Sequence, residues 1–545
     1  MSKHKKREWT IMVYLAGDNN LSVECVFALN EMKRVAGLEN FHLAVQFDPS
    51  DPFLPTHRYL IQENLAQLWS DITDQARFNP RTGEVHFSHE SKHADEFAKI
   101  RLRQRERASH VSENTRRASL GTAPDPTDGS NDDTDTASPI TLYNFLSFCI
   151  DEYPADHYIA VVCGHGAGTQ RDYLLRDTSP AGYLTLPELS QVFKQLLSDR
   201  KKPIEILGLD SCLMSMAEVC YELRGAVEIL VGSEGFSPAS GWPFRMVLQR
   251  LRDILHTATN KELQNDFATA IVEEYTNYYT NYWLGGLSVA QSAMDLRQVE
   301  QLKRAIDALA ARLAGALERD EPLLRDALVL AHWEAQSYNG ERFVDLYDFC
   351  DCLEKRSNDD HIQSECRGVK AAIGKFVLKS CYNGPAYQYS HGVSIYFPWA
   401  QVANSYRNLD LVRRPDSTEL RGWGRFLEIY TAKTRRRPRD IEAAPGLARE
   451  ADAIPQGSAT IRTLVRKTTD MKTTDMKTTD MGSGNDTLSM RNPPVVFVPD
   501  ICVREGKGIL EAERKLLGPA EVANFPREPK TGRSRRGAGK KRKGR

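Results

Sequence analysis

Short runs of apolar residues recur through the first half of the chain, and most are bounded by glycine or polar residues. A nearly continuous apolar run of this length is typical of a strand that is buried on both faces of a sheet. The clearest example reads His-Tyr-Ile-Ala-Val-Val-Cys and ends at Cys163. Strands are predicted in this way at residues 10–16, 42–47, 58–61, 157–163, 204–209 and 227–231.

Segments with the period of an amphipathic helix separate several of these strands. They are residues 23–35, 141–150, 187–198 and 214–223. Pro187 begins the third segment, at a position where a helix needs no backbone N–H donor. The alternation of buried strands with helices predicts an α/β fold, in which helices sandwich a mostly parallel sheet.

The pattern is mainly helical from Met246 to Leu378, with one strand predicted at 287–291. A last strand is predicted at 392–397, and a helix at 423–433 closes the patterned part of the chain. We therefore predict a folded domain over residues 9–433, and its C-terminal part is a helical extension of the α/β fold.

Two long polar stretches fall outside this pattern. Residues 63–138 are irregular, and within them Arg101–Ala137 is first rich in arginine and then in Asp, Thr, Ser and Pro. Residues 434–545 contain Lys-Thr-Thr-Asp-Met three times in succession. Neither composition buries enough apolar surface to offset the entropy lost on ordering the chain. We predict a partly disordered insertion at 63–138 and a mostly disordered tail at 434–545.

Charge and cysteine usage narrow the class of protein. The chain has 72 basic and 73 acidic residues, so its formal net charge of -1 gives no overall attraction to nucleic acid or to an anionic membrane. Its 10 cysteines include no CxxC pair, which favours reduced thiols. The apolar run Ile11–Ala16 is too short for a secretory signal, and no apolar window is long enough to span a membrane. We therefore expect a soluble, cytoplasmic protein with no membrane partner.

Two of the predicted strands lead into residues that can perform nucleophilic chemistry. One runs into Gly164-His165-Gly166, and the other runs into Asp210-Ser211-Cys212. The carboxyl ends of parallel strands open on one edge of a sheet, where ligands bind in this class of fold. We therefore expect His165 and Cys212 to converge there, with His165 as the base and Cys212 as the thiolate nucleophile.

Local features bear on this interpretation. The helix predicted after Cys212 would stabilise a thiolate through its N-terminus, and the backbone amides of Gly166 and Cys212 are candidates for an oxyanion hole. For an isolated pair, a turn histidine and a buried structural thiol are the commoner interpretation. The two strand ends favour catalysis, and the spacing from His165 to Cys212 is similar to the roughly 50 residues found in caspases.

Several motifs around these residues resemble those of clostripain-type cysteine peptidases, and they occur in the order found in that family. They include Gly-His-Gly and Leu-Asp-Ser-Cys-Leu-Met. The matching segments are residues 9–21, 153–158, 164–166, 209–214, 233–234, 241–244, 287–288 with Asp295, and 391–398. The resemblance extends from Trp9 to Tyr430 and leaves out the insertion and the tail.

The resemblance implies a caspase-like fold and a cysteine endopeptidase that cleaves protein or peptide substrates after Arg or Lys through a thioester acyl-enzyme. It implies His165 and Cys212 as the catalytic dyad and Asp210 as an acid of the S1 pocket, which receives the substrate residue before the cleaved bond. In an extended chain Asp210 and Cys212 also face the same side, and a carboxylate there would pair with a basic residue. Helix capping or loop bracing is the alternative role of Asp210.

The sequence departs from the family pattern in three ways. Ser240 stands where relatives often carry an acid before Gly-Trp, which weakens the argument for a second S1 acid and for a strict preference for Arg over Lys. Ser211 replaces a residue that is usually small and apolar. No long segment precedes Trp9, so we do not expect activation by removal of an N-terminal prodomain.

The resemblance also poses two further questions: whether the chain matures by self-cleavage, and whether it depends on calcium. Some relatives cleave themselves between the histidine and cysteine motifs, and here the polar stretch 169–182 contains Arg171 and Arg176. We expect cleavage after one of them, with an intact surface loop as the alternative. Asp172 and Asp177 are acids in the same stretch, but they do not specify a Ca²⁺ site, which takes roughly six to eight oxygen ligands. The Cys-His chemistry itself needs no cofactor or metal.

Other interpretations of the chain differ in what it acts on or binds. A hydrolase of a non-peptide amide would use the same dyad, whereas a catalytically silent caspase-like regulator would act by binding a partner; an intact dyad argues against the second. Ten basic residues and one acid lie between Arg527 and Arg545. This basic end is compatible with contact to nucleic acid, with a solvated disordered end, or with a segment that the peptidase trims itself.

Overall fold

The computed structural model describes residues 4–434 with gaps. Within this range the gaps are 36, 51–55, 63–64, 69–75, 79–84, 88–135, 170–172, 179–180, 259–262, 281–286, 340–341 and 415–418. Only the backbone is described for 62, 65–68, 76–78, 85–87, 173, 178 and 181. Most of the predicted insertion, and the predicted tail beyond Thr434, lie outside the described residues. Their predicted disorder therefore stays a prediction.

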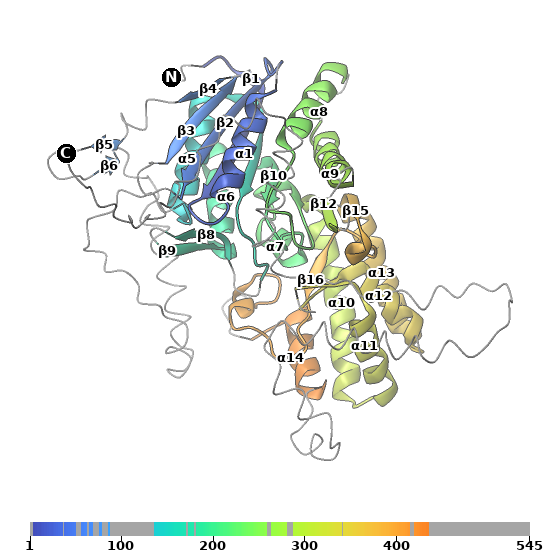
Figure 1. The fold of residues 1–545 in the computed structure, drawn as a ribbon. Coiled ribbons are helices and arrows are strands. Elements are labelled where there is room, and N and C mark those ends of the chain that lie inside the picture. The colour runs from blue at the N-terminus through green and yellow to red at the C-terminus, as the bar shows by residue number, and fades with distance from the viewer. Residues whose placement is uncertain are drawn as a thin grey trace, which may run out of the picture.

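In the described part of the chain, a nine-stranded sheet forms the centre of the fold, in the order β15-β12-β11-β10-β7-β1-β2-β3-β4 (Figure 1). The strands from β11 to β2 are parallel, which confirms the predicted sheet. They are β1 (Arg7–Gly17), β2 (Phe41–Pro49), β7 (Ala155–Cys163), β10 (Ile204–Asp210) and β11 (Val227–Gly232). Antiparallel strands extend both edges: β3 (His57–Gln62), β4 (Leu65–Leu68), β12 (Val289–Asp295) and β15 (Val377–Asn383).

Alternate residues of β1 face the two layers of helices that cover this sheet. Trp9, Ile11 and Val13 belong to one buried cluster, whereas Met12 and Tyr14 belong to the other. The first face is covered by α1 (Ser22–Lys33), α8 (Phe244–Thr257) and α9 (Gln264–Thr280), and the second by α5 (Pro139–Glu152) and α6 (Leu186–Arg200) (Figure 1). The predicted helix at 187–198 is α6, and it begins with a reciprocal capping box between Thr185 and Glu188.

The predicted helical extension packs beside this sheet. Its helices are α10 (Val299–Glu318), α11 (Pro322–Glu334), α12 (Leu346–Arg356), α13 (Asp360–Phe376) and α14 (Gly422–Thr434). The strand predicted at 392–397 is β16 (Ser394–Tyr396), which joins β13 (Ser337–Tyr338) and β14 (Phe343–Asp345) in a separate small sheet. Ser394 N donates to Ser215 O at 2.9 Å, and this bond ties the extension to the loop that carries Cys212.

β15 was not predicted, because the sequence around it continues a helical pattern up to Leu378. The strand follows α13 without a break, and its residues are only half-buried at the sheet edge. It therefore lacks the continuous apolar run that identifies the central strands.

Candidate active site

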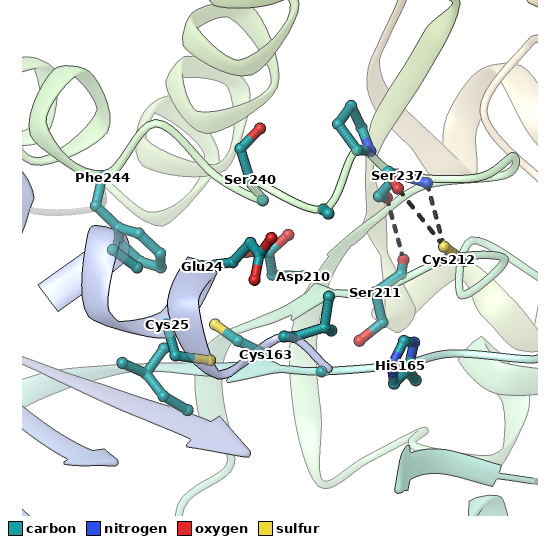
Figure 2. Close-up of a pocket in the computed structure, with 17 residues that line it drawn as sticks. Glu24, Cys25, Cys163, His165, Asp210, Ser211, Cys212, Ser237, Ser240 and Phe244 are labelled. Carbon is teal, nitrogen blue, oxygen red and sulfur yellow. Dashed lines mark hydrogen bonds between the residues drawn. The ribbon is translucent and has the colours of Figure 1, made fainter. Parts of the chain in front are cut away.

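The candidate site lies at the carboxyl edge of the sheet, where β1, β7 and β10 end side by side. Leu15 pairs with Cys163, and Cys163 pairs with Asp210 across the parallel ladder. Gly164 N donates to Asp210 O at 3.3 Å, so the loops that follow β7 and β10 leave the sheet together. His165 and Cys212 both line the pocket at this edge, as the two predicted strand ends require (Figure 2).

Cys212 lies in a tight loop, and the helix predicted at 214–223 begins later than expected. The helix α7 covers only Ala217–Glu222, so Cys212 does not directly precede a helix. Instead, Leu213 has a φ of 62°, and its N–H donates to Gly235 O at 2.9 Å. A left-handed conformation at a buried leucine costs about 1–2 kcal/mol, and such strain is commonest at functional sites.

A backbone amide supplies the hydrogen bond that the sequence assigned to a helix terminus. Ser237 N donates to Cys212 Sγ at 3.3 Å, as Figure 2 shows. A donor directed at the sulfur favours negative charge on it. The loop after β11 therefore takes over the role that was predicted for the start of the following helix.

His165 is half-buried, and its imidazole contacts the loop after β1. His165 Nε2 lies 2.7 Å from Asn20 Oδ1. An amide oxygen only accepts, so this contact assigns the hydrogen to Nε2 and leaves the lone pair on Nδ1. Burial, and secondly the positive charge of Arg176, lower the pKa of His165, which keeps the ring neutral and able to accept a proton.

Gly166 lies directly against the backbone of Cys212. A β-carbon on Gly166 would come 2.3 Å from Cys212 O and 3.1 Å from Cys212 N. Only glycine fits this approach without a shift of the main chain. The close packing brings together the two segments whose amides were predicted to form the oxyanion hole.

Asp210 lines the same pocket as Cys212 and also braces its wall. Trp242 N donates to Asp210 Oδ2 at 2.9 Å, and a β-carbon on Gly241 would come 2.4 Å from that oxygen. Burial raises the pKa of Asp210 to about 7. The carboxyl therefore combines the pocket position predicted for S1 with the alternative role of loop bracing, whereas helix capping is wrong because no helix begins there.

The loop that carries Trp242 is held by Tyr279 of α9. Tyr279 OH donates to Gly241 O at 2.6 Å, and Ser240 Oγ lies 2.9 Å from Tyr279 OH. Ser240 therefore packs within this loop. This role is consistent with a serine at a position where relatives often carry an acid. Ser211 is buried beside the pocket.

Other thiols and one further acid line the pocket. Cys25 and Cys163 are buried, and burial raises the pKa of both thiols, so they stay protonated and do not compete with Cys212 as nucleophiles. Glu24, in the first turn of α1, was missed by the sequence reasoning. Its position in the sequence could have identified it, because α1 follows β1, and β1 ends at the same edge of the sheet as β7 and β10.

Of the predicted self-cleavage and calcium residues, Arg176 and Asp177 are described, and neither lines this pocket. Arg171 and Asp172 lie outside the described residues. Arg176 is in β8 (Tyr173–Thr178), which pairs with β9 (Ala181–Thr185), and its carbonyl accepts a bond from Asn19 Nδ2 at 2.8 Å. Asp177 is buried, and its Oδ2 accepts bonds from Thr136 N at 2.7 Å and Thr136 Oγ1 at 2.8 Å.

The described residues offer neither a cluster of metal ligands nor a membrane-spanning helix. Among these residues, His, Cys, Asp and Glu form no group of three or more that could hold a metal ion. Within the same part of the chain, each helix is too short or too polar to cross a bilayer.

A thiol and a neutral imidazole in a pocket at the carboxyl edge of an α/β sheet characterise a cysteine-dependent hydrolase. The model of the clostripain family matches residues 13–428. The chain therefore belongs to the clostripain family, and it is a cysteine-type endopeptidase.

Individual relatives are distant in sequence. Clostripain from Hathewaya histolytica is 24% identical over 404 residues, which make up 66% of this chain and 68% of that protein. The structure of an inactive zymogen C11 protease from Parabacteroides distasonis has 18% identity and a TM-score of 0.47, with coverage of 75% of this chain and 98% of that one. A secreted C11 cysteine protease from Bacteroides thetaiotaomicron, in complex with an irreversible peptide inhibitor, has 17% identity and a TM-score of 0.47, with coverage of 74% and 97%.

Proposed function

We propose that this peptidase cleaves peptide bonds after arginine or lysine, with Cys212 and His165 as the catalytic dyad. The observation that carries the proposal is the position of Asp210, whose carboxyl lines the same pocket as Cys212. Burial raises the pKa of Asp210 to about 7, because the pocket offers little solvation to a negative charge. A basic substrate side chain would supply the compensating positive charge.

The proposed reaction begins with transfer of the Cys212 proton to His165. Nδ1 is the accepting atom, since Nε2 faces Asn20 Oδ1. Sγ then attacks the carbonyl carbon of the substrate, and a C–S bond forms while negative charge develops on the oxygen. The amides of Gly166 and Cys212 are the proposed donors to this oxyanion.

The second half of the reaction releases the two products. The C–N bond breaks as His165 returns its proton to the leaving amine, which leaves a thioester on Cys212. Water then attacks the thioester with His165 as base, so the acid product leaves and the thiol is restored. A hydrolase of a non-peptide amide would follow the same steps on another substrate. A catalytically silent binding protein would follow none of them. The substrates that are cleaved therefore discriminate among the peptidase, the amide hydrolase and the silent protein.

The test compares peptide amide reporters that differ only in P1, which is Arg, Lys or Gln. Wild type is expected to cleave the two basic reporters, and Asp210→Asn to lower kcat/KM for them by about ten- to hundredfold, because a hydrogen bond to a charged group is lost. Asp266→Asn, an exposed position on α9, is the matched control and should leave kcat/KM unchanged. Equal cleavage of the Gln reporter by wild type would refute the proposal.

We further propose that self-cleavage between the two catalytic residues occurs after Arg171 and not after Arg176. A peptide bond must leave its strand partners to enter an active site, and Arg176 is paired with Tyr183 in the β8–β9 hairpin. Arg171→Ala is therefore expected to abolish cleavage in this interval on a denaturing gel, whereas Arg176→Ala is not. An intact wild-type chain after prolonged incubation would contradict the idea.

A further inference from the structure

Glu24 is a buried carboxyl in the pocket that the proposed reaction does not use. It is 9% exposed, and its Oε2 has no hydrogen-bond partner among the described residues. Burial also raises the pKa of Glu24. A buried carboxyl oxygen without a partner is unfavourable for the free protein, so its position in a ligand pocket fits a site for a positively charged group.

Glu24 and Asp210 reach the pocket from different elements. Glu24 is on α1 and Asp210 ends β10, and both side chains line the one pocket that Figure 2 draws. Leu15, Leu21 and Phe244 also line the pocket. Apolar walls around two acids suit a side chain with an apolar stem and a cationic head.

We propose that Glu24 is a specificity-determining residue of the S1 pocket and makes the enzyme prefer arginine to lysine; this inference rests on the proposed cleavage after basic residues. A guanidinium presents five donors in one plane, so it can bond two carboxylates at once. It is also more weakly hydrated than an ammonium, which lowers the cost of entering a buried pocket. Glu24 on α1 is thus the second acid of the pocket. Ser240, in the loop that carries Trp242, does not provide one.

A purely structural role for Glu24 makes a different prediction. An acid in the first turn of a helix interacts favourably with the helix dipole, and Glu24 stands in that turn of α1. If this were its whole role, loss of its charge would lower thermal stability and leave substrate preference unchanged. Selectivity therefore separates the two roles.

The first measurement compares kcat/KM for matched Arg and Lys amide reporters in wild type and Glu24→Gln. The glutamine keeps the shape and removes the charge. We expect kcat/KM for the Arg reporter to fall by about tenfold or more and the Lys reporter to fall less. Glu31→Gln is the control, because Glu31 is on the same helix but pairs with Arg34 and Arg245 outside the pocket. An unchanged Arg-to-Lys ratio in Glu24→Gln would overturn the inference.

A second measurement needs no turnover. Cys212 is alkylated with iodoacetamide in the presence of butylguanidine or butylamine, and its modification is followed by mass spectrometry. We expect butylguanidine to protect wild type better than butylamine, and Glu24→Gln to lose this difference. If wild type cleaves neither reporter but Glu24-dependent protection is seen, the proposed cleavage fails, and Glu24 is shown to bind a guanidinium but not to set substrate preference. If wild type cleaves both reporters but protection does not depend on Glu24, only the inference fails.

Discussion

At the residue scale, Asn20 is the group that orients the proposed base. Its Oδ1 lies 2.7 Å from His165 Nε2, so the other ring nitrogen is left to accept the thiol proton. The sequence singled out His165 but not Asn20. Which loop meets the imidazole depends on the return of β1 to the same sheet edge, and the residue pattern predicts that edge but not the contacts made at it.

Removal of the Asn20 amide should slow turnover more than it weakens binding. Asn20→Ala is expected to lower kcat by about ten- to hundredfold with KM little changed, a loss similar to that found when a group that orients a metal-binding histidine is removed. Asn20→Asp keeps an acceptor at this position, and its carboxylate stabilises the imidazolium, so kcat should recover with its acid limb at higher pH. Steady-state kinetics across pH measure both effects, and a wild-type kcat in Asn20→Ala would contradict the role.

Asp210 and His165 predict different pH profiles for kcat/KM and kcat. Burial raises the pKa of Asp210 to about 7, so the free enzyme should gain affinity for a basic substrate as pH rises through about 7. Burial lowers the pKa of His165, so the base should stay neutral below its usual range near 6.5. We expect an acid limb near 7 in kcat/KM and a lower one in kcat. If the acid limbs of kcat/KM and kcat coincided, separate roles for Asp210 and His165 would be ruled out.

At the scale of elements, a buried acid pair joins the sheet to the helical extension. Glu234 follows β11, and its Oε2 accepts a bond from Gly392 N at 2.8 Å. Asp345 ends β14 and accepts bonds from Asp348 N at 2.6 Å and His391 N at 2.5 Å. Burial, and then the negative charge of Asp345, raise the pKa of Glu234 well above its usual range, so Glu234 should keep its proton to a higher pH in the fold than in the unfolded chain.

This pair should make stability fall as pH rises. Above the unfolded pKa of about 4.3, the unfolded chain releases the Glu234 proton while the native state keeps it, so unfolding becomes easier by up to about 1.4 kcal/mol per pH unit. Glu234→Gln stays neutral and can still accept from Gly392. Thermal unfolding between pH 5 and 8 should therefore show a flatter decline for Glu234→Gln than for wild type. Parallel declines would show that Glu234 is ionised in the fold.

At the scale of the whole molecule, the sequence predicted the features that continuous apolar runs determine. These are the buried parallel strands and the sheet edge at which they end. Ile159–Cys163 and Ile204–Leu209 are buried on both faces, so the parallel sheet and the shared edge for His165 and Cys212 followed from them. The helix after Cys212 was predicted too early, because Met214 and Met216 are apolar for loop packing and not for helix packing. Glu24 was missed because an acid in a first helical turn is common, and only the tertiary arrangement brings it to the pocket that Asp210 lines.

The central claim is that Cys212 cleaves polypeptides after basic residues. The most direct test incubates an unfolded protein substrate with wild type and with Cys212→Ala, and maps every new C-terminus by mass spectrometry. Wild type should produce fragments that end in Arg or Lys, with Arg ends formed first, and Cys212→Ala should produce none. Fragments that end in other residues, or the same fragments from Cys212→Ala, would contradict the account.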